Sequence, residues 1–152
     1  MEDNKPNPEQ LYTTSLIIWL SLFVSQFLFV VILYFTKPEL FRFDFMQPLL
    51  GDNAAIVAAL GFISITNILV SIGLRKKYLA QAVAEQNVGL VQTAMIIGCA
   101  LTESASLFGL ILGAVFGYQY FFVFSAIGIV GTTLHFPRRE SVHAASYKPQ
   151  IR

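Results

Sequence analysis

Four long apolar segments, separated by short polar connections, dominate the chain. They cover about residues 15–36, 53–74, 88–117 and 120–136, and within them the only charged side chain is Glu103. A helix of about 20 apolar residues crosses a hydrocarbon core of about 30 Å. The fourth segment, with 17 residues, is at the short limit. Backbone groups in lipid must be hydrogen-bonded within the protein, and none of the segments alternates as a barrel strand does. We therefore predict an all-α, polytopic integral membrane protein with four transmembrane helices.

The composition supports this prediction. Of the 152 residues, 55% are apolar and 12% are charged, whereas about a quarter of a soluble domain is charged. Too few polar side chains are present to cover a soluble globule, so the lipid bilayer is the expected partner. The net charge of +1 argues against nucleic acid as a partner, because duplex binding needs a basic face. We expect one membrane domain over residues 1–152, with flexible polar tails at 1–13 and 137–152.

Basic residues predict the orientation. Four spans place the N-terminus, the connection at Arg75–Lys77 and the C-terminus on one side, and that side holds eight of the ten Lys and Arg residues. By the positive-inside rule both termini are cytoplasmic, and we expect the bacterial inner (plasma) membrane. The first segment has neither a basic start nor a cleavage site, so it is expected to be a retained helix. In the outer loop, Phe41, Phe43 and Phe45 alternate with charges. This pattern suits a short strand, an amphipathic segment or an interfacial loop anchored by aromatics.

Glu103 is the principal functional candidate. A carboxylate near the bilayer centre costs roughly 2.5–3.5 kcal/mol on insertion scales, and such residues usually face protein or water. Three hydroxyls lie within three residues of it, on Thr102, Ser104 and Ser106. The acid is therefore expected to be either protonated and hydrogen-bonded, or ionised and bound to a hard cation such as sodium.

Polar residues of other segments are possible partners of Glu103. If segments two and three form a helical hairpin with its turn near Glu85, Asn67 and Glu103 are each 18 residues from that turn and lie at similar depth. Gln26 lies near the middle of segment one. A buried network of Glu103, Asn67 and Gln26 is geometrically possible. The alternative is that these side chains only hold the helices together, as polar residues do in ordinary membrane bundles.

Small residues also form a stripe along segment three. A stripe of this kind permits close packing, either within the bundle or between copies of the protein. The residues of the stripe are Ala94, Gly98, Thr102, Ala105, Gly109, Gly113 and Gly117.

No catalytic constellation is visible, and we expect that the protein is not an enzyme. A Ser/His/Asp set, a metal cluster and a phosphate-binding loop are all missing from the sequence. The lone Cys99 excludes an intrachain disulfide and is expected to be a packing residue. His135, at the end of segment four, is expected at the membrane interface.

Residues 92–110 resemble the second helix of the rotary ATP synthase c subunit, the proteolipid. Both have a run of small residues, then Ala-Leu-x-Glu, an aromatic residue and Gly-Leu. The resemblance implies that Glu103 is the ion-carrying carboxylate and that Ser104 matches the hydroxyl that follows it in sodium-type members. The chain departs from the family in its second segment, which lacks the glycine repeat of the family's first helix. It also lacks the Arg-Gln-Pro loop, and segments one and four have no counterpart in a two-helix c subunit.

The sequence therefore favours a proteolipid-like membrane subunit that binds or relays a proton or sodium ion. Glu103 is the expected ion-binding group, with Ser104 and Asn67 as candidate ligands, and no other cofactor is expected. The alternative is a structural or accessory subunit in which Glu103 is an interhelical contact. In either case we expect a homo-oligomer or a larger membrane complex. Labelling by a carbodiimide, which reacts with protonated carboxyls in lipid, separates the two.

Overall fold

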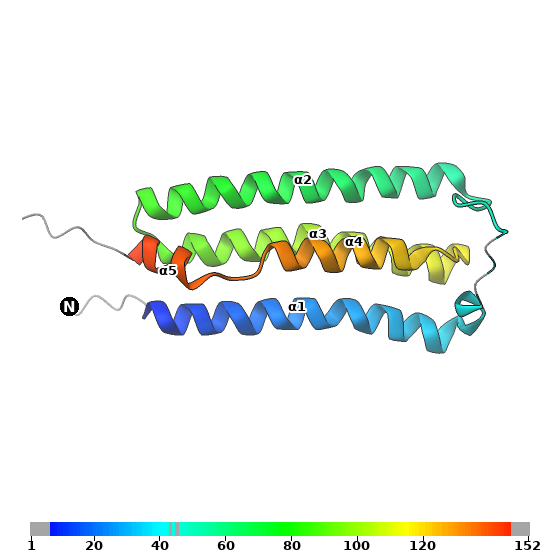
Figure 1. The fold of residues 1–152 in the computed structure, drawn as a ribbon, viewed down its shortest axis with the longest axis horizontal. Coiled ribbons are helices and arrows are strands. Elements are labelled where there is room, and N and C mark those ends of the chain that lie inside the picture. Colours follow the sequence, from blue (N-terminus) through cyan, green and yellow to red (C-terminus); the bar gives the residue numbers. More distant parts are fainter. Residues whose placement is uncertain (1–6, 43, 45, 147–152) are drawn as a thin grey trace, which may run out of the picture.

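The computed structural model is a bundle of helices, and it describes residues 7–42, 44 and 46–146 (Figure 1). No strand occurs in these ranges, which confirms the all-α prediction. Three long helices are followed by two short ones, and a 3-10 turn, η1, joins the first two. The elements are α1 (Pro8–Thr36), η1 (Pro38–Phe41), α2 (Ala54–Ala84), α3 (Val88–Phe116), α4 (Phe121–Leu134) and α5 (Arg139–Ser146).

Three of the helices are long and apolar enough to cross a membrane. Helices α1, α2 and α3 have 29, 31 and 29 residues, or roughly 43–46 Å at 1.5 Å per residue. Helix α4 has only 14 residues. It is followed by a break and by α5, which is bent by 41° relative to α4, and the two together pass as a fourth candidate span. Three of the four predicted spans are thus single helices, and the fourth is at most a broken one.

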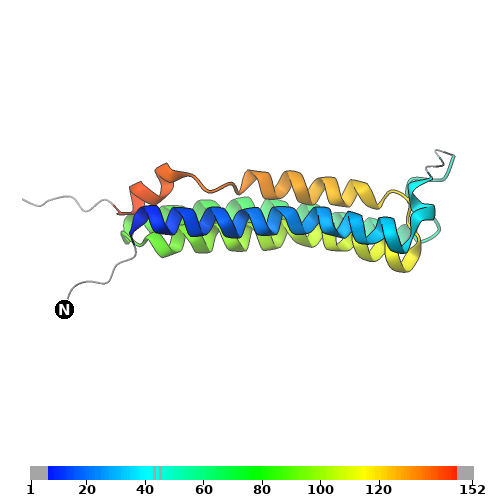
Figure 2. The same cartoon turned by 90° about the horizontal axis from the view of Figure 1, so that it is seen from below.

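Helix α3 is the centre of the bundle and packs against α1, α2 and α4. Figures 1 and 2 show α1 and α2 on opposite sides of α3, with α4 lying along it. The stripe of small residues makes this possible. Gly109 lies so close to α4 that an added Cβ would be 2.8 Å from the Phe121 carbonyl oxygen, and at Gly113 it would be 2.9 Å from Leu33 of α1. The stripe therefore packs inside the bundle rather than between copies.

Local sequence signals define several helix ends. Asn7 caps α1 by accepting a hydrogen bond from the Glu9 N–H, and Asn87 caps α3 by accepting one from the Gly89 N–H. Helix α3 stops at Gly117, whose φ of 63° is the left-handed conformation that glycine adopts readily. The connections at 85–87 and 117–120 are short. Helices α2 and α3 therefore form the hairpin that was supposed from the sequence, and α3 and α4 form a second one.

Several expected boundaries are wrong. Helix α1 begins at Pro8 instead of residue 15, and α2 continues to Ala84, so Arg75–Lys77 lies within a helix and not in a loop. Part of the expected flexible tail forms α5. The cause is a second apolar cluster beyond the membrane-length segments, in which Val142 and Ala145 of α5 are buried against Ala82 of α2.

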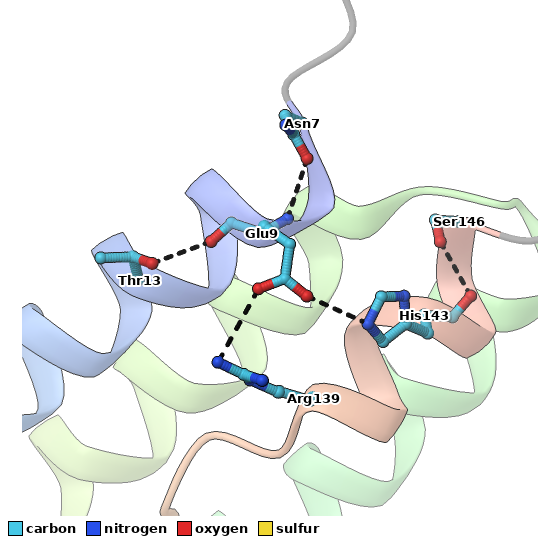
Figure 3. A network of polar contacts seen from close by, with 6 residues as sticks. All are labelled: Asn7, Glu9, Thr13, Arg139, His143 and Ser146. Carbon is cyan, nitrogen blue, oxygen red and sulfur yellow. Dashed lines mark hydrogen bonds and ion pairs between the residues drawn. The ribbon is translucent and has the colours of Figure 1, made fainter.

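A polar network ties α5 to the start of α1 (Figure 3). The carboxylate of Glu9 lies 3.9 Å from the Arg139 guanidinium and 3.4 Å from His143 Nε2. The Arg139 guanidinium also stacks 4.9 Å from the centre of the Tyr12 ring. These side chains are largely exposed, so the ion pairs add little stability, about 0–1 kcal/mol each. They show that the start of α1 and α5 lie at the same end of the bundle.

The loop between α1 and α2, predicted to lie on the outer side, contains η1 rather than a strand in its described part. Leu40 is buried, and the Phe41 ring packs edge-on against the rings of Tyr34 and Phe121. Phe43 and Phe45, the other members of the alternating pattern, lie outside the described residues. The described part of the loop therefore closes the apolar core at this end.

Candidate functional site

Glu103 lies near the middle of α3, on its outward face. Its carboxyl oxygen Oε1 accepts a hydrogen bond of 2.6 Å from the Ser25 hydroxyl of α1, and the side chain is half-buried. Four residues of α3 that lie one or two turns away from Glu103 are exposed: Ile96, Ala100, Leu107 and Ile111. Cys99 and Ser106, which are also one turn away, are fully buried, so the acid lies at the border between the α1–α3 contact and the exposed face of the bundle.

The second carboxyl oxygen, Oε2, has no hydrogen-bond partner in the described ranges, and it is not fully buried. An intramembrane acid usually faces a bundle interior or an aqueous cavity and is paired there. Glu103 is paired through only one oxygen. It therefore has the capacity to bind a proton or an ion on the other.

Asn67 and Ser104 contact each other but not Glu103. The Asn67 side-chain amide of α2 donates a 2.8 Å hydrogen bond to Ser104 Oγ, and the Ser104 hydroxyl donates to the Leu101 carbonyl. This pair joins α2 to α3, whereas Glu103 and Ser25 join α1 to α3. Glu103, Ser104 and Asn67, which the sequence suggested as an ion-binding site, therefore lie at one level of the bundle but do not form one cluster.

Gln26 belongs to a separate buried layer. It is fully buried, its amide donates to Thr132 Oγ1 at 2.6 Å, and its carbonyl oxygen accepts from the Ser106 hydroxyl at 2.7 Å. Thr102 Oγ1 lies 3.1 Å from Thr132 Oγ1 and extends the layer. The expected network of Glu103, Asn67 and Gln26 is thus replaced by three sets of contacts. The buried layer joins α1, α3 and α4 and satisfies its own polar groups.

His135 is fully buried among the helices, immediately after the end of α4, and its expected place at the membrane interface stays a prediction. Its Nε2 lies 3.0 Å from the Ser71 hydroxyl of α2, and its ring lies directly against Gly98 of α3, where an added Cβ would overlap it. Its Nδ1 has no partner in the described part of the chain. The sequence contained a signal for part of this contact. Ser71 of α2 and Gly98 of α3 lie at similar distances from the turn at 85–87, so the two residues that contact His135 are expected at similar depth in the bundle.

The irregular segment after α4 is held by side chains of other helices. The Trp19 indole N–H of α1 donates to the Thr132 carbonyl at 3.0 Å. The Arg75 guanidinium of α2 donates to the carbonyls of Leu134 and, at 3.1 Å, Phe136. Helix ends leave carbonyls without an intrahelical partner, and here two neighbouring helices supply the donors. Sequence reasoning assigned Arg75 to a loop and missed this role.

The opposite end of the bundle has a polar cavity of about 220 Å³ between the outer loop and the α3–α4 turn. The hydroxyls of Tyr118 and Tyr120 donate to the carbonyls of Leu49 and Gln47, at 2.8 and 2.9 Å. Burial raises the pKa of Tyr118 above its usual value. Its phenol therefore remains a donor, and the two tyrosines anchor the loop.

A metal centre is not indicated. In the ranges that the structure describes, no three His, Cys, Asp or Glu side chains are grouped as metal ligands, and Cys99 is fully buried in the bundle.

The comparisons show no family for this chain. No protein-family model matches it, and neither a curated protein nor a solved structure does. The resemblance of residues 92–110 to the c subunit therefore stays a prediction from the sequence.

Proposed function

We propose that this protein is an integral membrane subunit that relays a proton or a sodium ion through Glu103 to a partner on the outward face of α3. The observation that carries the proposal is the position of the acid at the edge of an exposed apolar face of α3, with one carboxyl oxygen bonded to Ser25. Against lipid alone, an ionised carboxylate there is unfavourable by roughly 2.5–3.5 kcal/mol or more. Protonation, ion binding or a covering partner removes that cost. The partner is either a second copy of the chain or another membrane protein.

The proposed cycle uses the two carboxyl oxygens differently. The Ser25 hydroxyl donates to Oε1 and stabilises the ionised form, since hydrogen bonds to a charged acceptor are strong. Oε2 takes up and releases the proton. One hydroxyl contact favours a proton over sodium, because hard cations bind several oxygen ligands at once. Ser104 and Asn67, the further ligands that the sequence suggested for sodium, bond to each other on the α2 side of α3 and not to Glu103. The proposed membrane is the bacterial inner membrane, with both termini cytoplasmic.

A second candidate function is that of a structural or accessory subunit. The Ser25–Glu103 hydrogen bond favours it, because this contact joins α1 to α3 and is of the kind that holds membrane helices together. In this case Glu103 never needs to change its charge. Replacing it with glutamine, which keeps the size and an accepting oxygen, leaves the function of the complex intact.

Carbodiimide labelling distinguishes the two candidates. Membranes containing the full chain are first washed with alkaline carbonate, and retention of the protein in the membrane pellet tests the membrane placement. They are then treated with a hydrophobic carbodiimide, which modifies protonated carboxyls in apolar surroundings, and the intact mass is measured. We expect one adduct, mapped to Glu103, absent from Glu103→Gln and suppressed by raised pH or by sodium.

Two variants sharpen the result. Ser25→Ala removes the donor to the ionised carboxylate, so the labelled fraction increases under fixed conditions. Ser21→Ala, one turn earlier on α1, removes an exposed hydroxyl that bonds only to its own helix and leaves labelling unchanged. An unlabelled Glu103, together with a fully functional Glu103→Gln complex, would eliminate the relay and leave the structural role.

A further inference from the structure

A cavity of about 300 Å³ lies between the end of α2 and the break that separates α4 from α5. One part of its wall is cationic, formed by Arg75, Lys76 and Arg138, and another part is apolar, formed by Ile72, Leu79 and Leu134. The end of α2 and helix α5, which border the cavity, lie on the side of the molecule where both ends of the described chain lie (Figures 1 and 2). It is distinct from the Glu103 site, which faces α1.

The three cations have no carboxylate partner. In the described ranges, ion pairs are formed only by Glu9, with Arg139 and His143 (Figure 3). Arg138 therefore has no ion-pair partner in the described ranges, although the next residue, Arg139, has one. Arg75 uses two N–H groups on the carbonyls after α4 and retains others, because a guanidinium has five N–H donors. Three unpaired cations around one cavity attract an anion with several acceptor oxygens.

The apolar part of the wall narrows the choice of anion. The uncharged run of α2 ends at Leu74, immediately before Arg75 and Lys76. The cavity therefore lies where the apolar bundle surface gives way to the charged end, the level of lipid headgroups in a bilayer. A free phosphate would contact only the cationic part. A phospholipid would also place an acyl chain along Ile72 and Leu134.

We propose that this cavity binds one anionic phospholipid, with its phosphate held by Arg75, Lys76 and Arg138. Basic pockets between transmembrane helices commonly bind anionic headgroups in this manner. The bound lipid would join α2 to the start of α5 and neutralise the charge that α2 and α5 bring together. The proposal rests on the membrane placement in the proposed function but not on any role of Glu103.

The test is native mass spectrometry of the detergent-purified full chain titrated with phosphatidylglycerol or phosphatidylcholine. We expect one tightly bound phosphatidylglycerol per chain and at least tenfold weaker binding of phosphatidylcholine. Each cation near a headgroup contributes roughly a fivefold change in affinity. Lys76→Gln and Arg138→Gln should each weaken phosphatidylglycerol binding by about that factor.

The chain offers matched controls for both variants. Lys77→Gln and Arg139→Gln remove the same charge at neighbouring positions that do not line the cavity, and both should keep wild-type affinity. Equal losses in the control variants, or equal binding of the two lipids, would overturn the proposal. Displacement of the lipid by equimolar inorganic phosphate would also overturn it, by identifying a free anion as the ligand. Carbodiimide labelling of Glu103 is a separate readout, so either proposal can fail alone.

Discussion

Replacing Gly128 with alanine tests whether α4 packs as closely as the structure shows. Gly128 lies over the buried polar layer, and its added Cβ would overlap Ser106 Oγ and lie 2.8 Å from Gln26 Oε1. It would also lie 3.0 Å from the backbone nitrogen of Ser106, which cannot move without moving α3. The substitution therefore either separates α4 from α3 or breaks the Ser106–Gln26 hydrogen bond.

The expected destabilisation follows from three contributions. Overpacking of a well-packed site costs about 1–3 kcal/mol, and the lost hydrogen bond costs about 1 kcal/mol. The better helix propensity of alanine offsets about 0.5–1 kcal/mol. We therefore expect Gly128→Ala to lower the free energy of unfolding by about 2 kcal/mol. This corresponds to a fall in Tm of about 4–8 °C for a chain of this size.

Gly73→Ala is the matched control. Gly73 is in α2, is exposed, and has no atom within 4 Å of an added Cβ, so its Tm should be unchanged or slightly raised. Both variants are measured in the same detergent by far-ultraviolet circular dichroism during heating. A Gly128→Ala protein that melts together with the wild type would refute the packing of α4 onto Ser106 and Gln26.

Two other substitutions test features described above. Gln26→Leu keeps the side-chain size but removes two hydrogen bonds from the buried layer, and should lower the free energy of unfolding by about 1–2 kcal/mol. Ser21→Ala on the same helix should leave the stability unchanged. Equal thermal midpoints for the two variants would contradict the hydrogen bonding of Gln26 in the buried layer. Val142→Asp places a carboxylate in the apolar cluster beneath α5 and should speed protease cleavage in the segment before α5 by at least about tenfold. Ala144→Asp, exposed on the same helix, should be cleaved at the wild-type rate, and a common rate for both would show that α5 is not docked.

The helical hairpins were predictable because apolar length and turn residues are local signals. The stop at Gly117 needs only a glycine after a helix, and it occurs where predicted. Helix α5 was not predictable in this way. Its apolar positions are few, and they are buried only because Ala82 and Val91, far away in the sequence, come to lie beneath them. The same cluster accounts for the extra turns at the end of α2.

The partners of Glu103 show a different limit of sequence reasoning. Counting residues from the turn predicts the depth of Asn67 correctly, and it does reach α3 at that level. It contacts Ser104, one residue further along, and successive residues of a helix differ by about 100° in direction. The depth of a residue along the bundle therefore follows from the sequence. The rotation of each helix about its own axis is instead fixed by the packing of helices α1 to α4 together.

The brevity of α4 has a consequence for how the protein is made. Its 14 residues extend roughly 21 Å, about two thirds of a hydrocarbon core. Carbonyls in its last turn and just after it accept hydrogen bonds from Trp19 of α1 and Arg75 of α2. Helices α1 and α2 precede α4 in the chain and are synthesised before it, so the end of α4 obtains these donors by docking against them.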